Sequence, residues 1–260
     1  GSWGRIHSRD YTIKQKIPNT EYGVEKAIAL GLGFDHPILK KAYRYLTGLI
    51  HSSRWRDPPE KNERWPVGIR LFIAATISLI NPDCRDIDDI WKLWTNVVKY
   101  TFKSGCYSQD AEKRIHQKLT GVQGNLKYLV VNSKYHVTLL GSRSAFLSEE
   151  LQKAYLNWIW NEIGCISYIN VPLHLSMEQL SNEQLVKWLH SVELLSKFKS
   201  WKNYAKRGID WLLHHRNKEN LWDFGQVSND LLRLSNNWRG SRRQHDWSTK
   251  ILLLLKKFYE

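Results

Sequence analysis

A short turn of one form recurs along the chain, as Ser104-Gly105-Cys106-Tyr107, Gly164-Cys165-Ile166-Ser167-Tyr168 and Asn220-Leu221-Trp222-Asp223. Each turn carries glycine or asparagine ahead of an aromatic residue and follows an amphipathic helical pattern. Gly1-Ser2-Trp3-Gly4 has the same form without a preceding helix. Patterns that are apolar on most sides alternate with these amphipathic ones. Such alternation in pairs is typical of a ring, so we predict an all-α protein with an α/α-toroid fold, its inner helices lining the centre.

Apolar residues repeat with the 3.6-residue period of a helix over most of the chain. Residues 67–80 are apolar almost all round and predict an inner, buried helix, whereas residues 86–102 predict an outer helix with one apolar face. Residues 128–140 are ambiguous, because their β-branched and aromatic residues also favour a strand. Further helices are predicted at residues 21–32, 37–50, 110–119, 148–162, 181–196 and 201–215, and from residue 246 through 255.

The 260 residues contain no long flexible linker, so we expect a single α/α-toroid domain over residues 1–260. Hydrophobic residues make up 42% and charged residues 25%, which excludes a disordered or collagen-like chain. No apolar run reaches the roughly 18 residues that span a bilayer. Because the chain starts at Gly1 and not at Met, we expect a fragment or a protein truncated at its N-terminus.

Three cysteines, Cys84, Cys106 and Cys165, lie far apart and form no CxxC pair. Such a set does not provide a full disulfide framework. The simplest interpretation is a protein of a reducing, cytoplasmic compartment.

The chain is strongly basic, with 39 Lys and Arg residues against 25 Asp and Glu residues and a net charge of +14. A positive balance favours an anionic partner, such as a phosphate compound, nucleic acid or acidic lipid. The alternative is that the basic residues are spread over helix faces and keep a tryptophan-rich protein soluble.

The run Arg207–Arg216, followed by Asn217–Trp222, resembles a degenerate QW repeat of squalene and oxidosqualene cyclases. Arg216 stands where that repeat has glutamine, and Asn220 where it has glycine. The β subunits of protein prenyltransferases share the same ring of helix pairs. The resemblance implies a toroid of the terpenoid cyclase and protein prenyltransferase superfamily. It also implies a central cavity for an anionic, partly apolar ligand, such as an isoprenoid diphosphate.

The string Asp86-Ile87-Asp88-Asp89 matches the DxDD string of class II terpenoid cyclases, whose middle aspartate protonates an alkene or epoxide. Neighbouring carboxylates help to keep one of them protonated, because like charges resist joint ionisation. A catalytic acid must face the cavity, however, and this string opens a helix predicted on the outside, where the helix dipole favours acidic residues. We therefore expect exposed, non-catalytic aspartates and keep Asp88 only as a discounted candidate.

A basic loop before the last helix is a candidate ligand site. Guanidinium groups of Arg239, Arg242 and Arg243 suit a phosphate or carboxylate, and Trp238 stands beside them. Asp246 follows as a candidate catalytic residue that points inward. Prenyltransferase β subunits hold a diphosphate with basic residues near this position, so the resemblance favours an anionic ligand. The alternative is a solvated loop with Asp246 as an ordinary helix cap.

Other loops that lead into buried helices supply further candidates. Aromatic residues with a few Arg and His suit a pocket for an isoprenoid, a sugar or a nucleobase. For any one aromatic residue the alternative is a position in the core or at a helix end. The candidates are Glu21 as a second catalytic residue, and His7, Arg54, Trp65 and His136 as ligand-binding residues.

No metal site is predicted, because the Asp-x-Cys spacing of the prenyltransferase zinc site is absent and His245 has no matching ligands before it. No cofactor is expected, with zinc and magnesium left open, and the sequence has no P-loop, GxGxxG, HExxH or GxSxG motif.

Three functions stay open. They are a terpenoid cyclase-like or prenyl-transferring enzyme or binder, a nucleic-acid-binding protein with a basic outer face, and a non-catalytic helical scaffold. The sequence indicates neither a reaction nor an oligomeric state.

Overall fold

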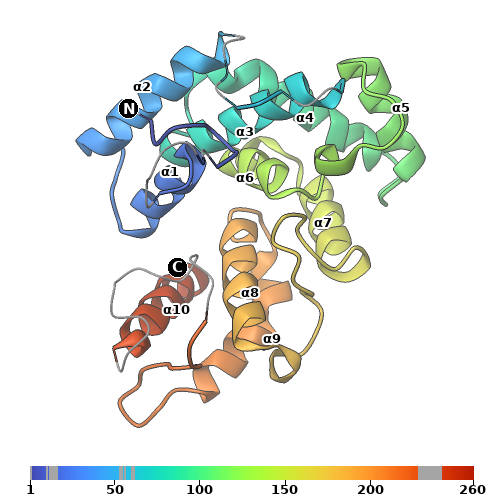
Figure 1. Cartoon of the computed structure of the whole chain (residues 1–260). Coiled ribbons are helices and arrows are strands. Elements are labelled where there is room, and N and C mark those ends of the chain that lie inside the picture. Colours follow the sequence, from blue (N-terminus) through green and yellow to red (C-terminus); the bar gives the residue numbers. More distant parts are fainter. Residues whose placement is uncertain are drawn as a thin grey trace. The chain divides into compact units, whose positions relative to one another are not determined.

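The computed structural model describes residues 2–9, 11, 17–52, 55, 57–59, 62–227 and 242–260. Within these residues the fold is all-α, with ten α-helices and no strand (Figure 1). The contacts within the chain divide it into two compact units, Gly1–Leu147 and Ser148–Glu260. The all-α class is therefore confirmed, whereas the ring of helix pairs and the single toroid domain stay predictions.

The first unit is built around helix α3, Arg64–Ile80. Helices α1, α2, α4 and α6 all pack against α3, and α5 packs against α4. These neighbours are α1 (Thr20–Ala29), α2 (Pro37–Ile50), α4 (Asp88–Thr101), α5 (Gln109–Thr120) and α6 (Lys134–Ser142).

Helices α3 and α4 differ in burial as their sequences predict. From Leu71 to Ile80, α3 has no charged residue, and nearly all of its side chains are buried. Helix α4 buries one face, including Ile90 and Trp94, and exposes Lys92 on another. The predicted contrast between a buried and an amphipathic helix is confirmed, while their inner and outer places in a ring stay predictions.

The second unit begins with α7, Glu149–Asn157, which continues as a π-helical turn over Trp158–Glu162. Helix α8 packs against both of the helices that follow it. No helix in the described part of the chain is long and apolar enough to cross a membrane. The remaining helices are α8 (Asn182–Leu195), α9 (Trp201–His214) and α10 (Arg243–Tyr259).

Helix ends follow local signals in most places. Helix α2 begins at Pro37, as predicted, because proline suits the first turn of a helix. The ambiguous residues 128–140 fold as a 3-10 turn, Lys127–Leu129, and helix α6, so tertiary burial outweighs their strand propensity. Helix α10 begins three residues earlier than predicted, at Arg243, and Asp246 lies within its first turn.

Candidate functional site

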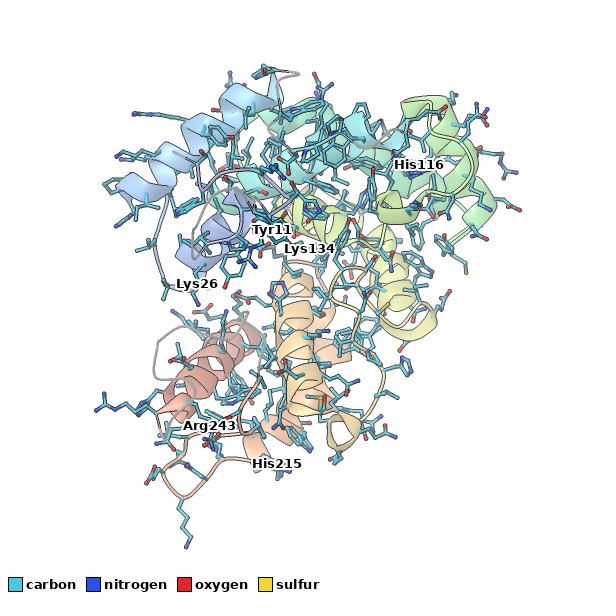
Figure 2. The ribbon with its side chains drawn as sticks, viewed as in Figure 1. Tyr11, Lys26, His116, Lys134, His215 and Arg243 are labelled. Atoms are coloured by element: carbon cyan, nitrogen blue, oxygen red, sulfur yellow. The ribbon has the colours of Figure 1, made fainter. Side chains whose placement is uncertain are left out.

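A buried charge cluster joins the start of the first unit to helix α6. This Glu21 cluster consists of Glu21, His7, Tyr135, Lys134 and Glu25. His7 Nδ1 lies 3.1 Å from Glu21 Oε2, and the Tyr135 hydroxyl lies 3.0 Å from both Glu21 carboxylate oxygens and 2.9 Å from His7 Nδ1. The Lys134 ammonium, at the start of α6 (Figure 2), contacts Glu21 and lies 3.1 Å from Glu25 Oε1. The structure thus brings together His7 and Glu21, which the sequence singled out for different roles.

Hydrogen bonds to the backbone hold the two segments that carry His7 and Glu21. The carboxylate of buried Asp57 accepts hydrogen bonds of 2.7, 2.9 and 2.7 Å from the backbone N–H groups of residues 6–8 in turn. Asn19 caps α1, so that Glu21 stands in the first helical turn, where the helix dipole favours a negative charge. Hydrogen bonds to the backbone of both segments therefore help to position His7 and Glu21.

Within the Glu21 cluster, Glu21 and Lys134 are both ionised. Burial opposes the charge of Glu21, but the Lys134 and His7 side chains outweigh it and lower the pKa of Glu21 to about 2. Burial also opposes the charge of Lys134, and the carboxylates of Glu21 and Glu25 raise its pKa above the usual range. His7 keeps 29% of its side chain exposed and Glu21 only 7%. A carboxylate that orients a half-exposed histidine is suited to proton transfer, although neither cavity described below is lined by these residues.

His136 and Trp65, both predicted to bind ligand, lie in the core of the first unit. His136 is fully buried, with its Nδ1 2.7 Å from the Ser133 hydroxyl and its ring edge-on to Trp94 at 4.3 Å. Burial, together with nearby His116, holds the pKa of His136 well below its usual range, so its ring is neutral at pH 7. Trp65 is likewise buried. Both side chains occupy core positions.

The basic loop before α10 is described only from Arg242 onward. Arg242 is exposed, whereas Arg243 donates from Nε to Asp223 Oδ1 at 2.7 Å, at the start of α10 (Figure 2). Asp246 is buried in the first turn of that helix. These residues belong to the second unit, and Glu21 and His7 belong to the first. Three further predicted ligand residues, Arg54, Trp238 and Arg239, lie outside the described residues.

The DxDD string lies at the start of α4 and is largely exposed, as predicted. Asp86 and Asp89 are exposed, and Asp88 is half-buried. An Asp86 carboxylate oxygen lies 2.9 Å from the His51 ring, and Asp88 pairs with the Arg143 guanidinium at 2.7 Å. The contacts are a hydrogen bond of Asp86 with His51 and an ion pair of Asp88 with Arg143 at a helix start, and a catalytic role for Asp88 stays discounted.

An aromatic cleft of about 320 Å³ lies within the second unit. Trp160 of the π-helical turn and Trp188 of α8 belong to its lining, are buried, and meet edge to face with ring centroids 6.4 Å apart. Tyr204 and Trp211, both on α9, also line the cleft and are half-buried. The lining also includes Met177 and the polar residues Asn161, His174, Ser176, Glu178, Asn203 and Arg207.

Gly208 brings α9 close to α8 at this cleft. A Cβ atom added at Gly208 would lie 2.4 Å from the Trp188 ring and 3.3 Å from Met177 Sδ, so only glycine fits without rearrangement. Trp211 stacks on His215, next to the end of α9 (Figure 2), with ring centroids 3.9 Å apart. The run that resembles a QW repeat therefore contributes directly to the walls of the cleft.

The charged groups of the cleft are not paired with each other. Arg207 is exposed and forms no ion pair within the described part of the chain. The adjacent Lys206, which is not in the lining, pairs with Asp210 at 2.6 Å. Glu178 is exposed, and a backbone N–H and the Ser176 hydroxyl lower the pKa of its carboxyl. The cleft thus offers one cation and one carboxylate beside aromatic surface.

The sequence did not point to this cleft, because its lining comes from separate segments between residues 160 and 211. One signal was present. Tyr204, Arg207, Gly208 and Trp211 stand at positions i, i+3, i+4 and i+7, so they share one face of a helix. An arginine among aromatic residues and glycine on such a face indicates a surface that is not fully covered by packing.

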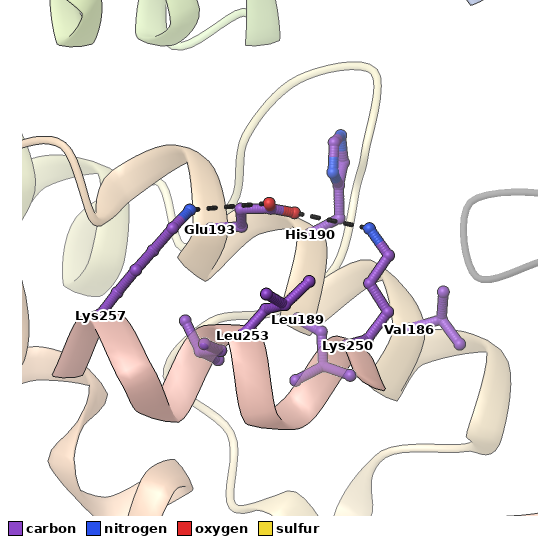
Figure 3. Close-up of a pocket in the computed structure, with 8 residues that line it drawn as sticks. Val186, Leu189, His190, Glu193, Lys250, Leu253 and Lys257 are labelled. Carbon is purple, nitrogen blue, oxygen red and sulfur yellow. Dashed lines mark ion pairs between the residues drawn. The ribbon is translucent and has the colours of Figure 1, made fainter. Parts of the chain in front are cut away.

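A much smaller pocket, of about 20 Å³, lies between α8 and α10 (Figure 3). There Glu193 lies 3.8 Å from Lys250 Nζ and 3.6 Å from Lys257 Nζ. Burial raises the pKa of Glu193, but the two lysines outweigh this effect and lower it. A single water needs roughly 10–15 Å³, so a pocket of this size holds little more than one water. We therefore interpret it as a gap in the packing around the ion pairs and not as a ligand site.

Comparison of the chain with known proteins gives no assignment: no family model, no curated protein and no solved structure matches it.

Proposed function

We propose that the protein binds a small anionic, partly apolar ligand in the aromatic cleft of its second unit. The observation that carries the proposal is the Arg207 guanidinium, which has no ion-pair partner among the described residues and lines the cleft with the half-buried rings of Tyr204 and Trp211. Small-molecule sites are concave, largely aromatic or apolar, and carry a few polar groups that fix the orientation of the ligand. The volume of the cleft falls at the lower end of the usual range of about 300–1,000 Å³.

The charge of the ligand follows from Arg207 and from the whole chain. A guanidinium group presents a planar fork of donors that matches a carboxylate or phosphate. No acidic side chain in the described residues occupies this fork. The net charge of +14 further favours the approach of anions. The resemblance to terpenoid cyclases and prenyltransferases makes an isoprenoid diphosphate one ligand to test.

Asn203→Trp provides a direct test, because Asn203 is an exposed residue of the lining and a tryptophan there fills the cleft without altering the core. We expect calorimetric titration with geranyl diphosphate and with glucuronate to show saturable binding of at least one of them. Binding should be lost in Asn203→Trp and retained in Lys206→Trp, on the same helix but outside the lining. No saturable binding, or equal binding by Asn203→Trp, would overturn the proposal.

Nucleic-acid binding by a basic outer face is the alternative that the net charge of +14 favours. Its signature is different. Affinity for a single-stranded oligonucleotide would fall steeply with salt concentration, since binding releases counterions from the phosphates. Oligonucleotide binding would also be unaffected by Asn203→Trp. Oligonucleotide binding that persists in this variant would favour the alternative.

A further inference from the structure

We infer that the ligand of the aromatic cleft is an acidic saccharide, a sugar ring that carries a single carboxylate. The inference rests on the proposed function, because it names the ligand class of the same cleft. Three properties of the lining decide between a sugar and a prenyl chain: its polar groups, its aromatic surface and its charges.

The polar groups of the lining do not suit a hydrocarbon chain. Asn161 and Asn203 are exposed amides, and His174 and Ser176 line the same cleft. A prenyl chain lying over these groups would remove their water without replacing the lost hydrogen bonds, which disfavours binding. Sugar hydroxyls both donate and accept, and so they match amide, hydroxyl and imidazole groups.

The aromatic groups of the lining suit a sugar ring as well. A pyranose has an apolar C–H face, whose burial against aromatic carbon is favourable because it removes apolar surface from water. Four aromatic residues line the cleft: Tyr204 and Trp211 are half-buried, and Trp160 and Trp188 are buried. The Tyr and Trp side chains combine a large apolar area with a polar atom, which fits a ligand that is apolar on one face and polar at its edge.

The charges of the lining fit one carboxylate better than a diphosphate. Arg207 is the one lysine or arginine among the described lining residues. Its guanidinium can donate two parallel hydrogen bonds to a carboxylate. Glu178 stands in the same lining and would repel further negative charge, whereas it can accept hydrogen bonds from neutral hydroxyls. A single carboxylate on a hydroxylated ring therefore uses both charged groups, and a diphosphate uses only one.

Calorimetric titration of the full chain with glucuronate and with glucose compares the same ring with and without the carboxylate. We expect glucuronate to bind about 10- to 100-fold more tightly than glucose, the range for a charge-assisted hydrogen bond. Arg207→Gln should reduce glucuronate affinity to nearly that of glucose. Lys206→Gln removes the same charge one residue away, outside the lining, and should leave the affinity unchanged. Circular dichroism melting checks that both variants stay folded. If Arg207→Gln is unfolded, Asn203→Trp replaces it in the titrations.

Each result has a distinct meaning. Equal affinities for glucuronate and glucose, or equal losses in Arg207→Gln and Lys206→Gln, would overturn the inference. Tighter, Arg207-dependent binding of geranyl diphosphate or of uridine monophosphate would also overturn it, but would leave the proposed function in place with another ligand class. Absence of binding by all four ligands would overturn both.

Discussion

Glu21 keeps a negative charge at a depth where a lone carboxylate would be neutral. The Lys134 ammonium, His7 and the Tyr135 hydroxyl surround it, and together they offset the loss of water. Such groups depend on each other, because removal of one partner leaves the other buried and uncompensated. The stability of the first unit should therefore depend on this one side chain and on pH.

Glu21→Gln should lower the free energy of unfolding at pH 7 by about 3–5 kcal/mol, since it leaves the Lys134 ammonium without its main partner. The folded pKa of Glu21, about 2, lies below the ordinary value of 4.5. Its contribution is therefore complete above pH 4.5 and is lost as pH falls toward 2. Urea denaturation at pH 7, 5 and 3 should show this acid-dependent loss of stability in the unsubstituted protein and not in Glu21→Gln.

Glu149→Gln is the matched control for this prediction, because Glu149 forms an exposed pair with Lys153 one helical turn away. It should leave the free energy of unfolding nearly unchanged, because solvent screens exposed ion pairs. A Glu21→Gln variant as stable as this control would contradict the prediction.

His116 on α5 (Figure 2) is fully buried, and neither of its ring nitrogens has a hydrogen-bond partner in the described residues. Burial lowers its pKa to about 4. His116→Phe keeps the ring shape and removes two unsatisfied polar atoms, so we expect a gain of about 1 kcal/mol at pH 7. The pKa of His116 in the folded protein lies below the ordinary value of 6.5, so on acidification the unfolded chain binds a proton before the folded protein does. Stability should therefore decrease as the pH falls from 6.5 to 4.

Thermal unfolding of His116→Phe across this pH range is the measurement. The variant should lack the part of the decline that His116 causes. A less stable variant with an unchanged decline would indicate that the imidazole is bonded in the native state.

At the scale of elements, helix α8 is positioned by a reciprocal cap. The Gln184 N–H donates to the Ser181 hydroxyl, and the Gln184 side-chain oxygen accepts from the Ser181 N–H. Ser181→Ala removes the acceptor and should lower the free energy of unfolding by about 1 kcal/mol. Ser181→Asp should restore most of the loss, because aspartate also caps helices well. Urea denaturation of the three proteins tests this, and equal stability of all three would argue against a role for the cap.

Helices could be predicted from the sequence wherever a local signal exists. Pro37 marks the start of α2, and the lack of charge after Arg70 predicts the burial of α3. The stretch 128–140 could not be decided locally, because its β-branched residues become helical only through burial against α3. The π-helical turn after α7 could not be predicted either, because no pattern in the sequence distinguishes it from an α-helix with a 3.6-residue period.

The candidate sites were less predictable than the helices. His7 and Glu21 could be selected from the sequence, but their partner Tyr135 lies 114 residues beyond Glu21, and no local pattern joins them. Trp160 and Trp188 come from separate segments and meet in the lining of the aromatic cleft, where Gly208 allows the close approach of α9 to Trp188. Contacts between distant segments depend on packing geometry, and a single sequence does not display that geometry.

At the scale of the whole molecule, each of the two compact units has one helix with several helical neighbours: α3 in Gly1–Leu147 contacts α1, α2, α4 and α6, and α8 in Ser148–Glu260 contacts α9 and α10. We expect residues 1–147 and 148–260, produced as separate chains, each to be helical and to melt cooperatively by circular dichroism. Units with their own apolar cores can fold independently. If either half stays unfolded alone, the single toroid domain predicted from the sequence becomes the better description.

The carboxylate of Asp57 bonds to backbone N–H groups that lie 51, 50 and 49 residues before it. Closure of such a long loop costs chain entropy before the contact repays it, so these bonds belong to the late steps of folding. Interactions that are absent from the transition state slow unfolding and leave the folding rate nearly unchanged. Stopped-flow kinetics of Asp57→Asn should therefore show faster unfolding at an unaltered refolding rate. Slower refolding would mean that the N-terminal segment docks early. On this view Asp57 determines the lifetime of the docked N-terminal segment and has little effect on how quickly the chain folds.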